Sequence, residues 1–251
     1  MMYLARELSW PRVKALSTAG AVALLPVGST EAHGPHLPLS VDVVIAEEVC
    51  RRVSAQLEVD TVMFPASVYS LTDFAAPFSG TVSVPAETAK ALLVAVLKGI
   101  AGSFATIAVI NHHLEPAHFR VVHAAAKEAG AAVTARIVVP DHRREPVGPT
   151  LGDEFMHGGS HAGGYETSLM LAAAPGMVDD EARRELRALE VDLPARIKAG
   201  ATDFLHCGGH DAYFGDPASA TAAEGDRLFA IIVAQALEAI RGQASLETRG
   251  T

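Results

Sequence analysis

Four short apolar runs stand out against the polar background of the chain, and they predict buried β-strands. They cover residues 21–27, 61–66, 105–111 and 133–139. The runs are continuously apolar rather than alternating, which is typical of strands covered on both faces of a parallel sheet. We therefore expect these four segments to form the centre of the fold.

Between and after the runs, apolar residues recur every three or four positions, as they do on one face of an α-helix. This spacing predicts helices over 45–57, 93–100, 116–130, 165–174 and about 221–241. Strands that alternate with helices form right-handed crossovers, and such crossovers give an α/β fold. The pattern predicts a single layer of about four parallel strands flanked by helices on both faces, in one domain over residues 1–251.

Composition narrows the class of protein and of partner. The chain is 49% hydrophobic and 20% charged, as expected of a globular protein. Its net charge of -9, with no basic run, argues against binding to nucleic acid or to an anionic membrane, and favours a small-molecule partner. Two cysteines are too few for a disulfide scaffold, and no apolar stretch of about 18 residues occurs. A cytoplasmic location is expected.

Polar loops follow all four predicted strands. They cover residues 31–42, 69–81, 111–118 and 141–148, and they carry histidine, acidic or small polar residues. In open parallel sheets, ligands bind where the carboxyl ends of the strands meet. The sequence therefore predicts a functional site at this edge of the sheet.

Two of these loops carry residues that ligate zinc, manganese or iron: Glu31, His33, Asp42, His113 and Glu115. In extended backbone, residues i and i+2 point to the same side, which pairs the first two residues with each other and the last two with each other. An aspartate at the start of the next helix could bridge two ions about 3.5–4 Å apart. One such pair alone is usually surface decoration, but two pairs after neighbouring strands favour a metal site.

A second group of candidate residues lies in the glycine-rich segment 157–171. Its glycines would let backbone approach a ligand closely around His161, and Glu166 opens an apolar helix. A loop followed by a capped helix is the plain alternative. A third interpretation makes Ser160 a nucleophile, but no strand leads into it and the last glycine of the G-x-S-x-G motif is replaced by alanine.

The remaining histidines are expected to have structural roles. His36 is expected to hydrogen-bond its proline-rich loop, and His112, His118 and His123 to be packing or solvated residues. The segment 205–211 contains cysteine and histidine without a second pair at zinc-finger spacing, so we expect a structural loop there.

Four segments in order resemble the creatininase (creatinine amidohydrolase) family: LPVGSTEAHGPHLPLSVD (25–42), FSGTVSV (78–84), SHAGGYETSLML (160–171) and GDPASATAAEG (215–225). The resemblance covers nearly the whole chain. It implies a four-stranded parallel sheet between helices, a homo-oligomer that is often a hexamer, and a divalent metal centre that hydrolyses C–N bonds of cyclic or related amides.

By this resemblance, Glu31, Asp42 and His113 hold one ion, while His33, Asp42 and Glu115 hold a second. His161 then serves as the proton shuttle. Glu166 is expected to orient it or its loop, as a catalytic residue. In many relatives the third strand ends in N-G-H-G-G-N, but here it ends in NHHLEP, which keeps the histidine and adds a glutamate two residues later. This difference favours two ions of zinc, manganese or iron over one.

The expected substrate is less closely tied to the family. His157 and Ser160 occupy the positions where creatininase has a tryptophan and a glutamate, and with Leu114 they are the expected substrate-binding residues. The resemblance thus implies an amidohydrolase acting on an amide other than creatinine, such as a formamide or lactam. Two alternatives stay open: a metal-independent serine hydrolase that uses Ser160, and a non-catalytic metal-binding member of the family.

Overall fold

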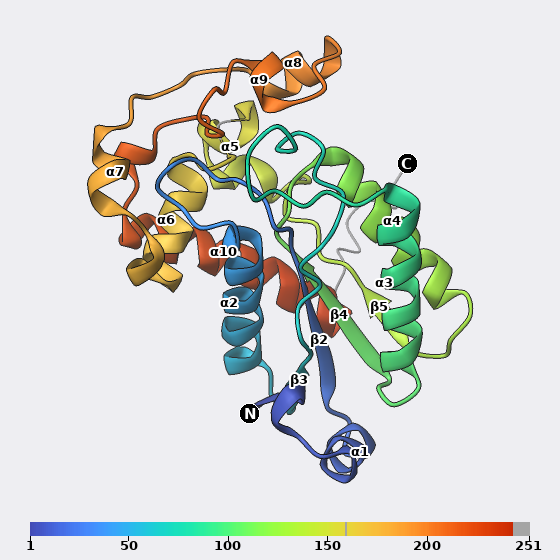
Figure 1. Ribbon diagram of the computed structural model, residues 1–251. Helices are drawn as coiled ribbons and strands as arrows, with labels where there is room; N and C mark the ends of the chain where they lie inside the picture. Colours follow the sequence, from blue (N-terminus) through green and yellow to red (C-terminus); the bar gives the residue numbers. More distant parts are fainter. Residues whose placement is uncertain (159, 243–251) are drawn as a thin grey trace, which may run out of the picture.

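The computed structural model describes residues 1–158 and 160–242 and contains a five-stranded parallel sheet (Figure 1). The strands lie in the order β1-β3-β2-β4-β5, with β2 and β4 in the middle. Their bounds are β1 (Met2–Leu4), β2 (Val22–Val27), β3 (Thr61–Met63), β4 (Thr106–Asn111) and β5 (Arg136–Val138). The predicted α/β class is confirmed.

Helices cover both faces of the sheet (Figure 1). Leu24 and Ile110 point to one face, and Leu25 and Val109 point to the other, because side chains alternate along a strand. The first face packs on α2 (Val41–Gln56), α6 (Gly164–Ala173) and α10 (Ala222–Arg241), and the second packs on α1 (Trp10–Thr18), α3 (Ala86–Ala101) and α4 (Pro116–Gly130). This double burial explains why the central strands are continuously apolar.

The close approach of α6 and α10 depends on one small residue. A Cβ atom placed on Gly225 would lie 2.0 Å from the carbonyl oxygen of Ser168. Only glycine therefore fits this contact, and the contact fixes the middle of α6 against the first turn of the long C-terminal helix.

The structure adds an edge strand that the sequence pattern did not predict. Residues 2–4 pair with Thr61–Met63, although the N-terminal segment has the charged, amphipathic character of a surface segment. The strands β3 and β5 are also shorter than the apolar runs 61–66 and 133–139. In β5 all three residues are at least partly exposed, and β3 ends two residues before Pro65, which lacks the N–H that a strand ladder needs.

The chain between α4 and α10 forms short helices above the carboxyl edge of the sheet. They are α5 (Asp153–His157), α7 (Asp180–Glu185), α8 (Leu193–Lys198) and α9 (Phe204–Cys207), with the 3-10 helices η2 (Gly148–Leu151), η3 (Pro175–Met177) and η4 (Pro217–Ser219). A further 3-10 helix, η1 (Ala5–Glu7), lies near the N-terminus, between β1 and α1. The helices α8 and α9 pack on Ala75 and Phe214 in a separate apolar cluster. Among the described residues, no helix has both the length and the apolar character needed to span a membrane.

Candidate metal centre

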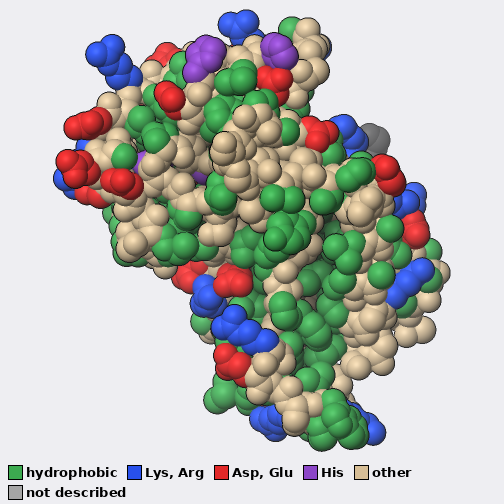
Figure 2. Space-filling model, viewed as in Figure 1, with side chains coloured by type: hydrophobic (Ala, Val, Ile, Leu, Met, Phe, Trp, Pro, Cys, Tyr) green, Lys and Arg blue, Asp and Glu red, His purple; other side chains and the backbone are tan. Residues whose placement is uncertain are grey.

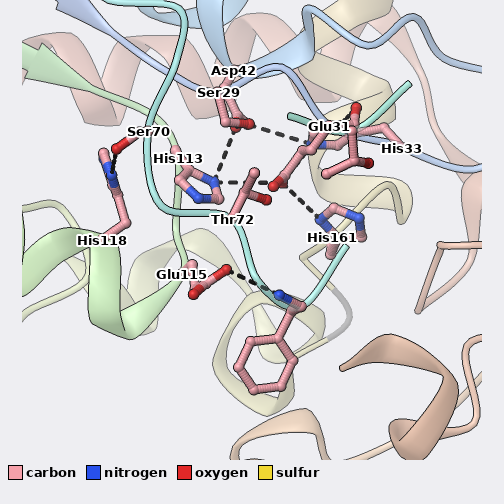
Figure 3. Close-up of polar contacts among 12 residues, drawn as sticks. Ser29, Glu31, His33, Asp42, Ser70, Thr72, His113, Glu115, His118 and His161 are labelled. Carbon is pink, nitrogen blue, oxygen red and sulfur yellow. Dashed lines mark hydrogen bonds and ion pairs between the residues drawn. The ribbon is translucent and has the colours of Figure 1, made fainter. Parts of the chain in front are cut away.

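Three parts of the chain bring buried carboxylates and imidazoles together at the carboxyl edge of the sheet (Figure 3). The loop after β2 and the first turn of α2 supply one part, the segment after β4 the second, and the start of α6 with the loop before it the third. Three sets of residues have ligand atoms within 4.8 Å of one another: Glu31, His33 and His161; Glu31, Asp42 and His113; and His33, Asp42 and Glu166.

The hydrogen bonds of His113 fix which of its nitrogens faces the carboxylates. Its Nε2 lies 2.9 Å from the carbonyl oxygen of Leu71, and because a carbonyl only accepts, Nε2 carries the hydrogen. The Nδ1 of the neutral ring then has a free lone pair, which points to Asp42 Oδ2 at 3.1 Å and Glu31 Oε1 at 3.4 Å. A lone pair facing two carboxylates is repulsive unless a cation or a proton lies between them.

The same arrangement holds for the two other imidazoles. In His33, Nδ1 donates to the carbonyl of Glu31 at 3.1 Å, and Nε2 faces Asp42 Oδ1 at 3.4 Å and Glu166 Oε2 at 3.5 Å. In His161, Nε2 donates to the carbonyl of Ala32 at 3.0 Å, and Nδ1 faces Glu31 Oε1 at 3.7 Å. A histidine that ligates a metal usually ties its second nitrogen to an acceptor in this way.

The electrostatics of the cluster also call for positive charge. Burial opposes protonation of His33, but Asp42, Glu166 and Glu31 raise its pKa to about 10. Burial first, and then the negative charge of Asp42, raise the pKa of Glu166 to about 8 although His33 lowers it. Protons thus supply here the charge that a divalent ion would supply. Glu31 Oε2 and His33 Nε2 are buried without a hydrogen-bond partner, so the residues present fit a metal ion.

The structure brings four of the five predicted metal ligands together and sets Glu115 apart from them. Its Oε2 accepts a hydrogen bond from the Phe74 N–H at 3.4 Å, and burial raises its pKa to about 7. The i, i+2 spacing does not carry over because β4 ends at Asn111, and Glu115 already caps α4. Glu166, expected to orient the catalytic histidine or its loop, accepts a hydrogen bond at 2.7 Å from the N–H of Ala162, the residue after His161. Its carboxylate also lies beside His33 and Asp42.

A small cavity of about 60 Å³ opens onto the cluster. Ser160 and Leu114, two of the three predicted substrate-binding residues, line it together with Glu115. His157 lies elsewhere: it is exposed, it lines a separate surface cavity, and its Nδ1 bonds to the backbone carbonyl of Asp153. The sequence pattern missed the apolar walls of the cavity, which come from the segment 193–204 and from the loop after β3: Phe74, Leu193, Ile197 and Phe204.

The histidines expected to be structural are not members of the three ligand sets, although the His118 ring packs on His113 with 4.6 Å between ring centres. His36, expected to hydrogen-bond its own proline-rich loop, is buried and bonds Thr167 Oγ1 of α6 at 2.9 Å instead. His112 and His118 are buried, while the side chain of His123 is 37% exposed. The segment 205–211 contributes Cys207 to the apolar cluster under α8 and α9, in agreement with a structural role.

Comparison with known proteins identifies the class of protein. The family model of creatininase, described as creatinine amidohydrolase, matches residues 6–240. The mycofactocin precursor peptide peptidase of Mycobacterium tuberculosis is 31% identical over 241 residues, covering 90% of this chain and 87% of the relative. The creatinine amidohydrolase of Pseudomonas putida is 29% identical over 190 residues, covering 69% and 72%. The chain belongs to the creatininase family.

Solved structures agree with this assignment. A crystal structure of creatinine amidohydrolase superposes with a TM-score of 0.79 at 24% identity, covering 96% of this chain and 97% of the other. A putative creatinine amidohydrolase from Bacteroides fragilis gives 0.71 at 18% identity, covering 97% of each chain. The creatininase-like fold is therefore confirmed. Family, relatives and the ligand sets together support a metal-dependent amidohydrolase.

Proposed function

We propose that this protein hydrolyses the C–N bond of an amide with water activated at a two-ion centre. One ion would be held by Glu31, Asp42 and His113, and the other by His33, Asp42 and Glu166. When bound, such ions lower the pKa of a water molecule and polarise the amide carbonyl. The observation that carries the proposal is the shared orientation of the three imidazoles, each with one lone pair turned to the carboxylates.

Zinc and manganese are the ions that the family comparison favours. Two solved creatininases that share this fold are described as Mn and Zn-Zn forms, with TM-scores of 0.76 and 0.74 at 22% identity. Mixed imidazole and carboxylate ligands suit zinc, manganese and iron alike. In this proposal Glu166 replaces Glu115 as a ligand, and Glu115 faces the substrate cavity.

The surroundings of His161 support the proposal that it is the proton shuttle. Its ring is held at Nε2 by the carbonyl of Ala32, it lines the cavity, and it packs against Phe204 with 4.2 Å between ring centres. Its Nδ1 would take a proton from the attacking water and pass it to the leaving nitrogen. The apolar walls would keep bulk water from this exchange, which strengthens the electrostatic interactions in the cavity.

We propose two candidate classes of substrate. An amide other than creatinine, such as a formamide, a lactam or a related small amide, follows from the different residues at positions 157 and 160. A peptide bond is the second candidate, because mycobacterial relatives at 31–32% identity are precursor peptide peptidases. The apolar walls favour a substrate with an apolar group next to the amide.

We also propose a single domain, a homo-oligomer and a cytoplasmic location. Hydrophobic side chains gather over the lower part of the face shown in Figure 2. Large apolar residues are exposed on the described surface, among them Trp10 at 76% and Leu92 at 51%. Exposed apolar patches often mark protein interfaces, which is consistent with assembly into a homo-oligomer. Size-exclusion chromatography with light scattering would measure the assembly state.

Metal analysis combined with Asp42→Asn tests the proposal. Asp42 belongs to both ligand sets, so the variant should lose both ions and amide hydrolysis, while Asp141→Asn, a buried control outside the sets, should keep both. Full turnover in Asp42→Asn would refute the two-ion centre.

Assays of the wild-type protein and of Ser160→Ala distinguish the two alternative functions from metal-dependent hydrolysis. A serine hydrolase would survive chelation and lose activity in Ser160→Ala, but no imidazole is hydrogen-bonded to Ser160 among the residues that the structure describes. A non-catalytic family member would bind metal without hydrolysing any of a panel of formamides, lactams and peptides.

A further inference from the structure

His113, proposed above as a metal ligand, is held at both its side chain and its backbone. Its Nε2 donates to the carbonyl of Leu71 at 2.9 Å. Its own carbonyl accepts from the side-chain amide of Asn111 at 2.9 Å, and its N–H lies 3.4 Å from Asn111 Oδ1. Two separate segments, the end of β4 and the loop after β3, thus fix the position of one residue.

His118 connects these two anchors. Its Nε2 lies 2.8 Å from Asn111 Oδ1. Its Nδ1 lies 2.5 Å from Ser70 Oγ, a contact that Figure 3 shows. Ser70 directly precedes Leu71, whose carbonyl holds the His113 imidazole. The three side chains of Ser70, Asn111 and His118, which we call the His113 network, therefore close a circuit around the proposed ligand.

Only one assignment of donors and acceptors satisfies all the hydrogen bonds of this network. The His113 carbonyl only accepts, so Asn111 presents its amide nitrogen there and its oxygen to His118. His118 must then donate from Nε2, which leaves Nδ1 to accept from the Ser70 hydroxyl. All members are 1–4% exposed, so water cannot replace a lost partner, and breaking one link leaves a buried polar group unpaired.

We propose that Ser70, Asn111 and His118 are positioning residues that keep the His113 Nδ1 lone pair directed at the carboxylate cluster. This inference rests on the proposed role of His113 as a ligand. Partners that orient a ligating histidine typically contribute tenfold to a hundredfold to metal affinity. The network reaches the ligand through its backbone, through Leu71 and through the His118 ring, which packs on the His113 ring with 4.6 Å between ring centres.

His118→Phe tests the proposal, because phenylalanine keeps a ring at the site and removes both hydrogen bonds. His142→Phe is the matched control, since His142 is equally buried but lies outside the His113 network. Chelator competition on folded, zinc-loaded protein should show about 10- to 100-fold weaker zinc binding in His118→Phe and no change in the control. The visible spectrum of the Co²⁺-loaded protein should shift only in His118→Phe.

A second measurement uses the protein without metal. In ¹⁵N-labelled wild type, the His113 Nε2–H should exchange slowly because it is buried and bonded to Leu71. His118→Phe should lose this protection, and Ser70→Ala, a smaller change if His118→Phe does not fold, should weaken both protection and zinc affinity. Wild-type zinc affinity and protection in the folded variants would overturn the inference and leave the proposed function intact. A wild type that binds no divalent ion but keeps the protection would overturn the proposed function alone.

Discussion

Replacing Glu166 by glutamine is the sharpest test of which glutamate completes the second ion site. The substitution removes the negative charge that the carboxylate would present to a bound ion, but keeps an oxygen that can accept the 2.7 Å hydrogen bond from the Ala162 N–H. The local fold at the start of α6 should therefore survive. Glu115→Gln is the matched variant, because it removes the same charge from a residue in the same cavity.

The size of the effect follows from the distance between charges. Glu166 Oε2 lies 3.5 Å from His33 Nε2, so an ion bound between them would be in direct contact with the carboxylate. Two unit charges about 4 Å apart interact by about 4 kcal/mol at an effective dielectric constant of about 20. Since about 1.4 kcal/mol corresponds to a factor of ten, losing this charge should weaken binding of the second ion by about a thousandfold or more.

Plasma mass spectrometry after dialysis against a metal buffer would count the ions, and calorimetry would give both affinities. We expect two ions per chain in wild type and in Glu115→Gln, and one in Glu166→Gln. The reverse result, one ion in Glu115→Gln and two in Glu166→Gln, would show that Glu115 is the ligand, and the arrangement drawn from the buried cluster would be wrong.

Three further predictions concern stability. Chelator-treated protein should lose thermal stability as pH rises from 7 to 9. In the folded chain the pKa of His33 is raised to about 10 and that of Glu166 to about 8, so both residues hold protons that the unfolded chain releases. Metal-loaded protein should not lose stability over this range. Stability should also fall as pH drops below 6.5. Burial lowers the pKa of folded His112 to about 3, so the unfolded chain binds a proton that the folded chain does not. Calorimetry from pH 7 to 4 would measure the fall in stability. Gly225→Ala should cost about 1–3 kcal/mol in urea unfolding through overlap with Ser168, whereas Gly99→Ala, with open space around it in α3, should be neutral or stabilising by up to about 1 kcal/mol.

The central strands and the long helices could be predicted from the sequence because burial on both faces leaves a direct apolar signal. The edge strand β1 carries no such signal, since its three residues are all only partly buried and its pairing with β3 is decided by tertiary contact. The short helices α8 and α9 are missed for a similar reason. Each buries few side chains, so the sequence shows no helical spacing of apolar residues long enough to predict them.

At the site, the positions of the residues that follow β2 and β4 could be predicted, because the strand ends fix where these residues lie. Glu115 shows the limit of this reasoning. Pro116, the next residue, begins α4. The Glu115 side chain therefore does not take the position that a continued strand would give it. The place of Glu166 beside His33 depends on how α6 packs against α2 and α10, which no local pattern reveals.

The apolar cluster under α8 and α9 forms a cover that is distinct from the buried carboxylates and imidazoles at the carboxyl edge of the sheet. None of the residues in the three ligand sets belongs to that cover. Substitutions of Leu193 and Ile197 would change the apolar walls of the cavity and leave the carboxylates in place. Phe204 differs from them, because its ring packs on His161 with 4.2 Å between ring centres. A single scaffold could in this way serve relatives that carry names as different as a peptide peptidase and a creatinine amidohydrolase.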